Sequence, residues 1–231
     1  MEPDLTWLRP SKRDAPARVS IQIHNGGTAG AASRSYLFMN ITSATPTTDV
    51  EWAFIKSLFT DAFPADERPS FDRIRELHRQ SPFFKVNLFR WNDFPVGFIS
   101  QWDFDTFTYV EHAAFDPSVR GKGLGSLAFT HLLNRLDRPC ILEVEPPTGD
   151  IEKRRIGFYE RLGFKLSPYH YIQPPYSPDK KALVMRLMTH NVFLENESTI
   201  ARQIEIIYEK VYQTSVEKMQ MLYPTLFNAS K

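Results

Sequence analysis

The sequence has a single cysteine, Cys140, so no disulfide can form within the 231-residue chain. No apolar run approaches the roughly 20 residues that a membrane-spanning helix needs, and the first residues lack the apolar stretch of a secretory signal. An excess of one charge is also missing, because 28 Lys and Arg stand against 27 Asp and Glu. These absences argue against a disulfide scaffold, a membrane protein and a nucleic-acid-binding face, and they predict a cytoplasmic protein.

The features that are present favour one folded domain with an extension at each end. Hydrophobic residues make up 42% of the chain and aromatic residues 13%, which is enough for a packed core. Residues 1–35 show no sustained period and include the small-residue run Gly26–Ser33, so we expect a mobile extension there. Residues 36–190 carry the periodic segments of the domain, and residues 191–231 are expected to form a C-terminal helical extension.

Apolar periodicity predicts a mixed α/β domain with an antiparallel first half. Three strands follow one another closely, and connections as short as Asn92-Asp93 join antiparallel neighbours. The expected strands are Tyr36–Ser43, Phe83–Trp91, Val96–Phe104, Phe107–Phe115, Pro139–Val144, Phe164–Tyr171 and Leu183–Met188. The expected helices are Thr48–Ala62, Ser70–Arg79, Leu124–Leu136, Asp150–Leu162 and Glu195–Leu222.

Two of these helices have apolar stripes that predict their buried faces. In the first helix, Val50, Phe54, Leu58 and Ala62 recur every four residues on one side. The C-terminal helix has a longer stripe, which consists of Ile200, Ile204, Ile207, Tyr208, Val211, Met219 and Leu222. This stripe either packs against its own domain or forms an interface between two copies of the chain.

A glycine-rich turn follows the third strand of the meander and opens the next helix. Its glycines alternate along the chain at Gly121, Gly123 and Gly125. Glycine allows a tight turn and removes the Cβ atoms that would keep a ligand away from the backbone. The first N–H groups of a helix lack internal partners and carry partial positive charge, so they hold a pyrophosphate well. Arg120 and Lys122 add positive charge at the rim.

Other glycine motifs fit this turn less well. A dinucleotide fingerprint needs a later third glycine and a first parallel strand before it, and a P-loop needs Gly-Lys followed by Ser or Thr. The remaining alternative is a flexible turn without a ligand, which the glycine pattern alone does not exclude.

A second motif at the right separation gives the turn a family resemblance. Arg120-x-x-Gly123-x-Gly125 resembles the Arg/Gln-x-x-Gly-x-Gly/Ala signature of the GNAT superfamily of N-acetyltransferases. The segment Tyr159-Glu160-Arg161-Leu162-Gly163-Phe164 resembles the Tyr-x-x-x-Gly-Phe element of the same family. The resemblance covers about residues 39–188. The family often has Asn and Ala ahead of this tyrosine, where the present chain has Glu152 and Arg155.

The resemblance implies a GNAT-like fold, with a mostly antiparallel sheet of six to seven strands that splays between strands four and five, and helices on both faces. It implies acetyl-CoA as co-substrate, no metal ion, and direct attack by a small-molecule or peptide amine in a ternary complex. The implied cofactor-binding residues are Ala113, Phe115, Arg120, Gly121, Lys122, Gly123, Leu124, Gly125 and Ser126.

Three side chains are candidates for the chemistry. Tyr159 is the expected general acid for the leaving thiolate, with a core tyrosine as the alternative. Glu111 and Glu143 are equal candidates for the general base, because each is a carboxylate among apolar strand neighbours, and an ion pair is the alternative for each. Period two places Glu111 on the same strand face as Tyr109 and Ala113 and places His112 on the opposite face, as a packed core residue.

The acceptor site is expected between the segments Asp61–Ser70 and Pro168–Asp179, which combine carboxylates with Tyr169, Tyr171 and Tyr176. A polyamine, an amino acid and an N-terminal peptide all remain candidate acceptors. Two further functional alternatives remain. One is a non-catalytic acyl-CoA-binding or regulatory module of the same fold, and the other is an interaction protein that works through its C-terminal helix.

Overall fold

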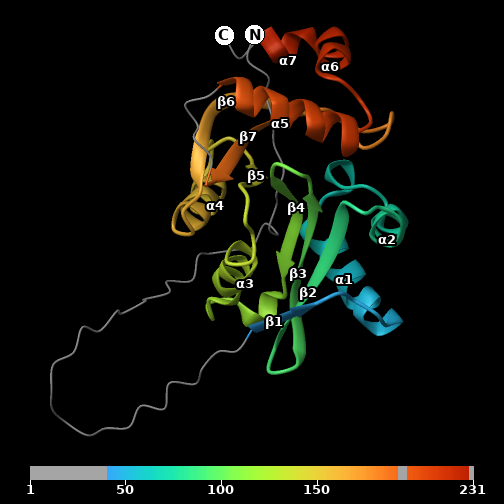
Figure 1. Ribbon diagram of the computed structural model, residues 1–231, viewed down its shortest axis with the longest axis vertical. Helices are drawn as coiled ribbons and strands as arrows, with labels where there is room; N and C mark the ends of the chain where they lie inside the picture. Colours follow the sequence, from blue (N-terminus) through green and yellow to red (C-terminus); the bar gives the residue numbers. More distant parts are fainter. Residues whose placement is uncertain (1–40, 192–196, 229–231) are drawn as a thin grey trace, which may run out of the picture.

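The computed structural model describes residues 41–191 and 197–228, which form a seven-stranded sheet with helices on both faces (Figure 1). The strands are β1 (Ile41–Ala44), β2 (Phe84–Trp91), β3 (Phe94–Asp103), β4 (Thr108–Phe115), β5 (Cys140–Val144), β6 (Lys165–Gln173) and β7 (Leu183–His190). The helices are α1 (Asp49–Ala62), α2 (Phe71–Gln80), α3 (Leu124–Leu133), α4 (Asp150–Glu160), α5 (Glu197–Lys210), α6 (Val216–Leu222) and α7 (Pro224–Asn228), with 3₁₀ turns at Ala65–Glu67 and Pro117–Val119. The expected N-terminal extension lies outside the described residues.

The strand order is β1-β2-β3-β4-β5-β7-β6, and every neighbouring pair is antiparallel except β4 and β5. The meander β2–β4 follows from its short connections, and the β2–β3 turn places Asn92 and Asp93 at positive φ, which these residue types tolerate. The mixed α/β architecture predicted from the sequence is therefore confirmed. No helix among the described residues is both long and apolar enough to cross a membrane.

Each face of the sheet has its own hydrophobic core. Helices α1, α2, α5 and α6 pack on one face, through residues such as Phe59, Ile74 and Ile204. Helices α3 and α4 cover the other face, through residues such as Phe129 and Tyr159. In Figure 1, α3 and α4 lie on one side of the central strands and α1 and α2 on the other. Helix α4 and the start of α3 therefore share one face, and the C-terminal helices belong to the other.

Helix α1 begins where the sequence predicts but turns a different face inward. Thr48 and Glu51 form a capping box at its start. The predicted stripe was wrong at Val50, which is 80% exposed. The buried residues are Trp52, Ile55, Leu58, Phe59 and Ala62. Their spacing of three and four residues follows the 3.6-residue period of a helix. A strict four-residue recurrence drifts away from that period.

Strands β4 and β5 separate soon after they meet. Only Thr108 with Cys140 and Tyr109 with Ile141 are paired, although β4 continues to Phe115. The expected splay is therefore present, and the later residues of β4 have no β5 neighbour. Backbone groups on that edge of β4 are free to bond a ligand instead of a strand.

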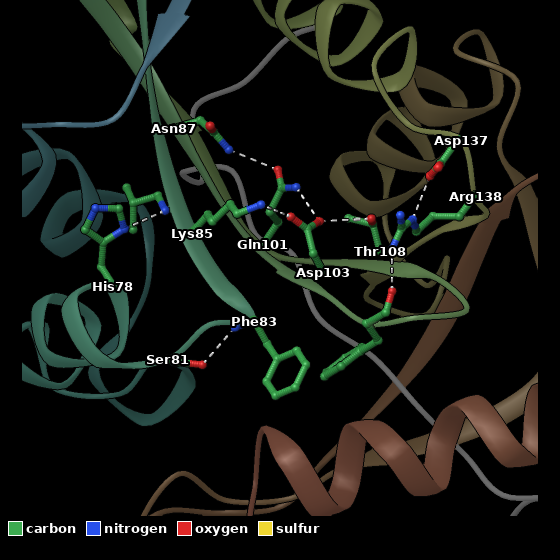
Figure 2. A network of polar contacts seen from close by, with 12 residues as sticks. His78, Ser81, Phe83, Lys85, Asn87, Gln101, Asp103, Thr108, Asp137 and Arg138 are labelled. Atoms are coloured by element: carbon green, nitrogen blue, oxygen red, sulfur yellow. Dashed lines mark hydrogen bonds and ion pairs between the residues drawn. The ribbon is translucent and has the colours of Figure 1, made fainter.

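A polar network holds the closed end of this splay (Figure 2). The Asp103 carboxylate accepts hydrogen bonds from Gln101 Nε2 at 2.7 Å, Thr108 Oγ1 at 3.0 Å and Lys85 Nζ at 2.8 Å. Nearby, Arg138 Nη1 donates to the Phe104 carbonyl at 2.8 Å and so ties the loop before β5 to the β3–β4 hairpin. The strands are fixed at this end and diverge toward the glycine-rich turn.

The C-terminal extension is three helices rather than the one that periodicity predicts. Helix α5 ends at Lys210, and Gln213 then has a positive φ of 54°, which no helix continues through. Ile200, Ile204, Ile207 and Tyr208 are fully buried in the core shared with α1 and α2. Leu222 was expected in the same stripe but is 54% exposed. Most of the stripe therefore packs against its own chain.

Candidate active site

The glycine-rich turn connects β4 to α3 through two left-handed residues. Asp116 Oδ1 accepts the Ser118 amide at 2.7 Å and so caps the 3₁₀ turn that follows β4. Gly121 and Gly123 then adopt φ values of 77° and 73°, a region that strongly favours glycine, and α3 begins at Leu124. The glycines are therefore required by the backbone path as well as by any ligand.

The backbone N–H groups at the start of α3 are free of backbone partners. Within the described residues, the amides of Gly123, Leu124, Gly125 and Ser126 donate to no main-chain carbonyl, and the first such bond runs from Leu127 to Gly123 at 3.1 Å. The amides of Arg120 and Lys122 differ, because they donate to Pro117 and Val119 within the turn. The anion-binding donors are thus concentrated in the four residues from Gly123 onward.

These amides lie at a pocket of about 150 Å³ between the turn, the end of β4 and helix α4. The residues that line it include every predicted cofactor-binding residue except Lys122, whose Nζ lies 4.9 Å from the centre of the Trp91 ring. The α4 side of the pocket consists of Ile151, Arg154, Arg155, Phe158 and Tyr159. A Cβ atom on Gly125 would point between Phe115 and Phe158, at 3.6 and 3.7 Å, so this glycine also keeps the pocket open.

Two arginines of α4 have different roles at this pocket. Arg155 is buried and forms an ion pair with Glu145 just after β5, so its charge is already compensated. Arg154 is exposed at the pocket rim, and its Nε bonds the Asp150 carbonyl at 3.1 Å. Arg154 therefore places a cation beside the α3 amides without a carboxylate partner in any described ion pair.

Tyr159 lies at the inner end of the same pocket. Its side chain is 2% exposed and its ring is surrounded by Phe129, Phe158 and Phe164, with ring centres 5.3, 5.0 and 5.7 Å away. These edge-to-face contacts fix the ring direction. Tyr159 packs in the core and also lines the pocket. A core position and a role as general acid are therefore compatible for this residue.

A β-bulge at Glu111 shifts the faces of Ala113 and His112 from the period-two prediction, whereas Glu111 shares a face with Tyr109 as predicted. Ser100 pairs with His112 and the next residue of β3, Gln101, pairs with Val110, so Glu111 is the extra residue of β4. As a result, Tyr109 and Ala113 belong to the cores on opposite faces of the sheet, which corrects the prediction that they share a face. The expectation that His112 points away from Glu111 was also wrong, because His112 Nδ1 lies 3.9 Å from Glu111 Oε1.

Glu111 is a buried carboxylate with a donor on each oxygen. Trp102 Nε1 donates to Oε2 at 2.7 Å, and the Tyr176 hydroxyl donates to Oε1 at 2.7 Å. Burial raises the pKa of Glu111 to about 7, against the lowering effect of the hydrogen bonds from Tyr176 and Trp102. A carboxyl group with this pKa takes up and releases a proton near neutral pH.

Glu143 lies on β5 on the same face as Glu111 but in a different environment. It is fully buried, and within the described residues neither of its carboxyl oxygens has a hydrogen bond of normal geometry. Burial raises its pKa well above the ordinary value, although the nearby Tyr109 hydroxyl lowers it somewhat and Glu111 raises it further. The environment of Glu143 therefore favours its protonated form.

His112 is a neutral neighbour of this carboxyl pair. Its Nδ1 lies 3.2 Å from Ser100 Oγ, and its ring packs edge-on against Phe59 and Phe63. Burial, with a contribution from Arg68, lowers the pKa of His112 to about 3. The prediction that His112 is a packed residue fits these contacts. No group of three or more His, Cys, Asp or Glu side chains in residues 41–191 and 197–228 is arranged to hold a metal ion.

Comparison with known proteins decides the family. A family model described as the acetyltransferase (GNAT) family matches residues 52–164, which include the turn, Glu111, Glu143 and Tyr159. A solved structure from Bacteroides thetaiotaomicron, a candidate acetyltransferase from the GNAT family, is 38% identical to this chain, with a TM-score of 0.68. That similarity covers 75% of the present chain and 98% of the Bacteroides chain. The chain belongs to the GNAT acetyltransferase family.

More distant GNAT relatives agree with this assignment. The candidate acetyltransferase YjbC of Bacillus subtilis (strain 168) is 26% identical over 118 residues, which are 50% of this chain and 61% of YjbC. The structure of an aminoglycoside 6′-N-acetyltransferase complexed with coenzyme A is 15% identical, covers 65% of this chain and 96% of its own, and has a TM-score of 0.51, which shows the shared fold.

Several residues at the carboxyl pair were not assigned a role from the sequence. Trp102 gave no signal, because an inward tryptophan on a strand is an ordinary core residue. Tyr176 was placed in the expected acceptor loop, but its bond to Glu111 could not be foreseen. Tyr212 reaches the same cluster from beyond α5. Tyr176 and Tyr212 both lie outside the segment that matches the GNAT family model.

Proposed function

We propose that this GNAT acetyltransferase moves the acetyl group of acetyl-CoA to a primary amine while both substrates are bound. The observation that carries the proposal is the set of partner-free amides from Gly123 to Ser126, which line a pocket beside the open edge of β4. Such a set of donors fits the pyrophosphate of CoA, because each amide can bond a phosphate oxygen and the helix dipole adds to the attraction.

The walls of the pocket also fit the rest of acetyl-CoA. Arg154 supplies a cation at the rim, and Phe115 and Phe158 supply an apolar surface for the pantetheine arm. The backbone of β4 beyond Tyr109 has no β5 partner, so Ala113 and Phe115 offer main-chain groups to the amides of that arm. We infer that the acetyl end lies between the diverging strands, close to the face that carries Glu111.

The chemistry then needs one base and one acid. Glu111 takes the proton that the substrate ammonium must lose, and the neutral nitrogen attacks the thioester carbonyl carbon. A C–N bond forms, the attached nitrogen gives a second proton to solvent, the C–S bond breaks, and the sulfur leaves with the bonding electron pair. Tyr159 gives its proton to that sulfur and recovers one from solvent, so the products are an N-acetylated amine and CoA.

The environments of the two carboxyl groups support Glu111 as the base rather than Glu143. With a pKa of about 7, Glu111 is ionised in a useful fraction at neutral pH and its two donors hold it in one orientation. Glu143 has a pKa raised well above its ordinary value and, among the described residues, no hydrogen bond of normal geometry to either oxygen, so burial favours its protonated form.

One observation supports a second candidate function. Glu111 and Glu143 are 1% and 0% exposed, so the acceptor side of the site is closed by the β6–β7 loop and the C-terminal helices. A protein that stays closed would be an acyl-CoA-binding or regulatory module without turnover. An enzyme instead needs the loop that carries Tyr176 to move when the amine enters.

Acetyl-CoA titration calorimetry beside a thiol-release assay with a panel of amines tests both functions. The panel should include a diamine, a polyamine, an amino acid and a peptide with a free N-terminus. Binding of acetyl-CoA together with release of CoA in the presence of one amine class supports the enzyme. Binding without release for any amine supports the module, and no binding at all contradicts both.

A further inference from the structure

The C-terminal extension brings an aromatic side chain to the candidate base. Helix α5 ends at Lys210, and Tyr212 lies between this end and the left-handed residue Gln213. Tyr212 then packs against Tyr176, with ring centres 5.5 Å apart and an angle of 43° between the rings. On its other side Tyr212 meets Tyr208 of α5 edge-on at 6.5 Å.

Tyr176 is the residue through which this contact reaches Glu111. It lies in the loop between β6 and β7, where no strand pairing fixes the backbone. Its hydroxyl donates to Glu111 Oε1 at 2.7 Å, and its ring stacks beside His112 with centres 6.3 Å apart. A phenol on a loop keeps such a bond only where packing holds its ring in place. Lys180 Nζ lies 5.8 Å from the centre of the Tyr176 ring, and Tyr212 is the aromatic contact that the C-terminal extension adds.

We propose that Tyr212 is a positioning residue, which the C-terminal helices supply to hold Tyr176 in its hydrogen bond to Glu111. The effect of Tyr212 on catalysis rests on the proposed function, in which Glu111 is the base. The contacts among Tyr212, Tyr176 and Glu111 do not depend on that function. The acetyltransferase site is therefore completed by residues from beyond the segment that matches the family model.

The electrostatics of the cluster agree with this geometry. The Tyr212 hydroxyl interacts with Tyr171 and Tyr176 and lowers the pKa of both, against the raising effect of burial. The hydrogen bond from Tyr176 in turn lowers the pKa of Glu111, so its loss leaves the protonated form of Glu111 more stable. The other polar and titratable groups that face Glu111 come from four elements: Trp102 of β3, Tyr109 and His112 of β4, Glu143 of β5 and Arg73 of α2.

A direct test measures the pKa of the Glu111 carboxyl by ¹³C NMR in the full chain labelled at glutamate, with Glu111→Gln used to assign the signal. The variants are Tyr212→Leu, Tyr176→Phe and the double variant. Tyr208→Phe is the matched control. It removes a hydroxyl from the same helical extension, but this hydroxyl donates to the Ile172 carbonyl. Tyr212→Phe separates the role of the ring from that of the hydroxyl.

We expect Tyr176→Phe to raise the pKa of Glu111 by about 0.5 to 1 unit, the size expected for the loss of one hydrogen bond to a carboxylate. Tyr212→Leu should raise it in the same direction, and it should add nothing in the Tyr176→Phe background. Tyr208→Phe should leave it unchanged. An unchanged pKa in Tyr212→Leu, or the same added shift with and without Tyr176, would overturn the positioning role.

A kinetic measurement then separates this inference from the proposed function. In an active enzyme, the acidic limb of the kcat/KM profile should move to higher pH in Tyr212→Leu and stay in place in Tyr208→Phe. If the NMR shifts appear but no amine is acetylated by the wild-type protein, the coupling stands and the proposed function fails. If the wild-type protein is active and the acidic limb does not move in Tyr212→Leu, the positioning role fails.

Discussion

The indole nitrogen of Trp102 donates a hydrogen bond to the carboxylate of Glu111 across 2.7 Å, and both side chains are almost fully buried. Glu111 lies two residues beyond Tyr109, so both side chains reach the face of the sheet where Trp102 packs. It favours the ionised form of Glu111 in a place where burial alone would keep the proton bound.

Replacing Trp102 with Phe should therefore raise the pKa of Glu111 further above 7. Because the base must be ionised, the acidic limb of the kcat/KM profile should move to higher pH while the alkaline limb stays in place. Trp52→Phe is the control, since Trp52 is also buried but lies in α1 against Phe71 and His78. An equal shift in both variants would show that general loosening of the core, and not the hydrogen bond, moves the profile.

Tyr159→Phe should lower kcat and leave the affinity for acetyl-CoA nearly unchanged. The ring contacts with Phe129, Phe158 and Phe164 remain in this variant, and only the proposed proton donor is lost. General acid catalysis contributes about 10²- to 10⁴-fold, which sets the expected size of the loss. The measurement pairs single-turnover kinetics with acetyl-CoA calorimetry, and full activity of Tyr159→Phe would exclude Tyr159 as the acid.

The buried Glu111 should also make stability depend on pH. Its pKa rises from the usual 4.5 in the unfolded chain to about 7 in the folded protein, so the folded state binds more protons between these values. The stabilisation is complete below pH 4.5 and is lost as the pH rises to about 7, with a slope of at most about 1.4 kcal/mol per pH unit. Chemical unfolding at several pH values should show a shallower fall in Glu111→Gln; an unchanged slope would contradict the raised pKa.

The C-terminal helices should contribute strongly to folding. Ile204 of α5 is fully buried in the core that also contains α1 and α2, so Ile204→Ala should lower the free energy of unfolding by about 2–5 kcal/mol. Met221→Ala is the control, because Met221 is 72% exposed and its loss should change stability by less than about 0.5 kcal/mol. Equal effects of the two variants would mean that α5 does not pack as described.

The sequence predicted the order of strands and helices because turn residues and apolar periods are local signals. The cap at Thr48, the Asn92-Asp93 turn and the glycines at 121 and 123 all lie where local chemistry requires them. The residues that line the pocket could be predicted from the same glycine-rich turn, because the start of a helix fixes the direction of its free amides. Whether those residues bind acetyl-CoA stays a prediction.

The acceptor side could not be predicted in the same way, because it depends on contacts between distant segments. One extra residue at Glu111 changes which face each later side chain of β4 occupies, and no feature of the sequence marks that bulge. The break after Lys210 was equally hidden, because the apolar spacing continues through Val211 to Met219 while the backbone turns at Gln213. The contact between Tyr212 and Tyr176 likewise joins two segments that are distant in the sequence.

The central claim is that the amides at the start of α3 hold the pyrophosphate of acetyl-CoA, and calorimetry of CoA binding to Gly125→Asp and Gly125→Ala tests it most directly. An added Cβ meets only ordinary contacts at this position, and an acidic residue in the first turn stabilises a helix by about 0.3–1 kcal/mol. We expect Gly125→Asp to unfold at the same temperature as Gly125→Ala or higher, yet to bind CoA at least about tenfold more weakly, because its carboxylate repels the phosphates. Equal CoA affinities in two folded variants would contradict the claim.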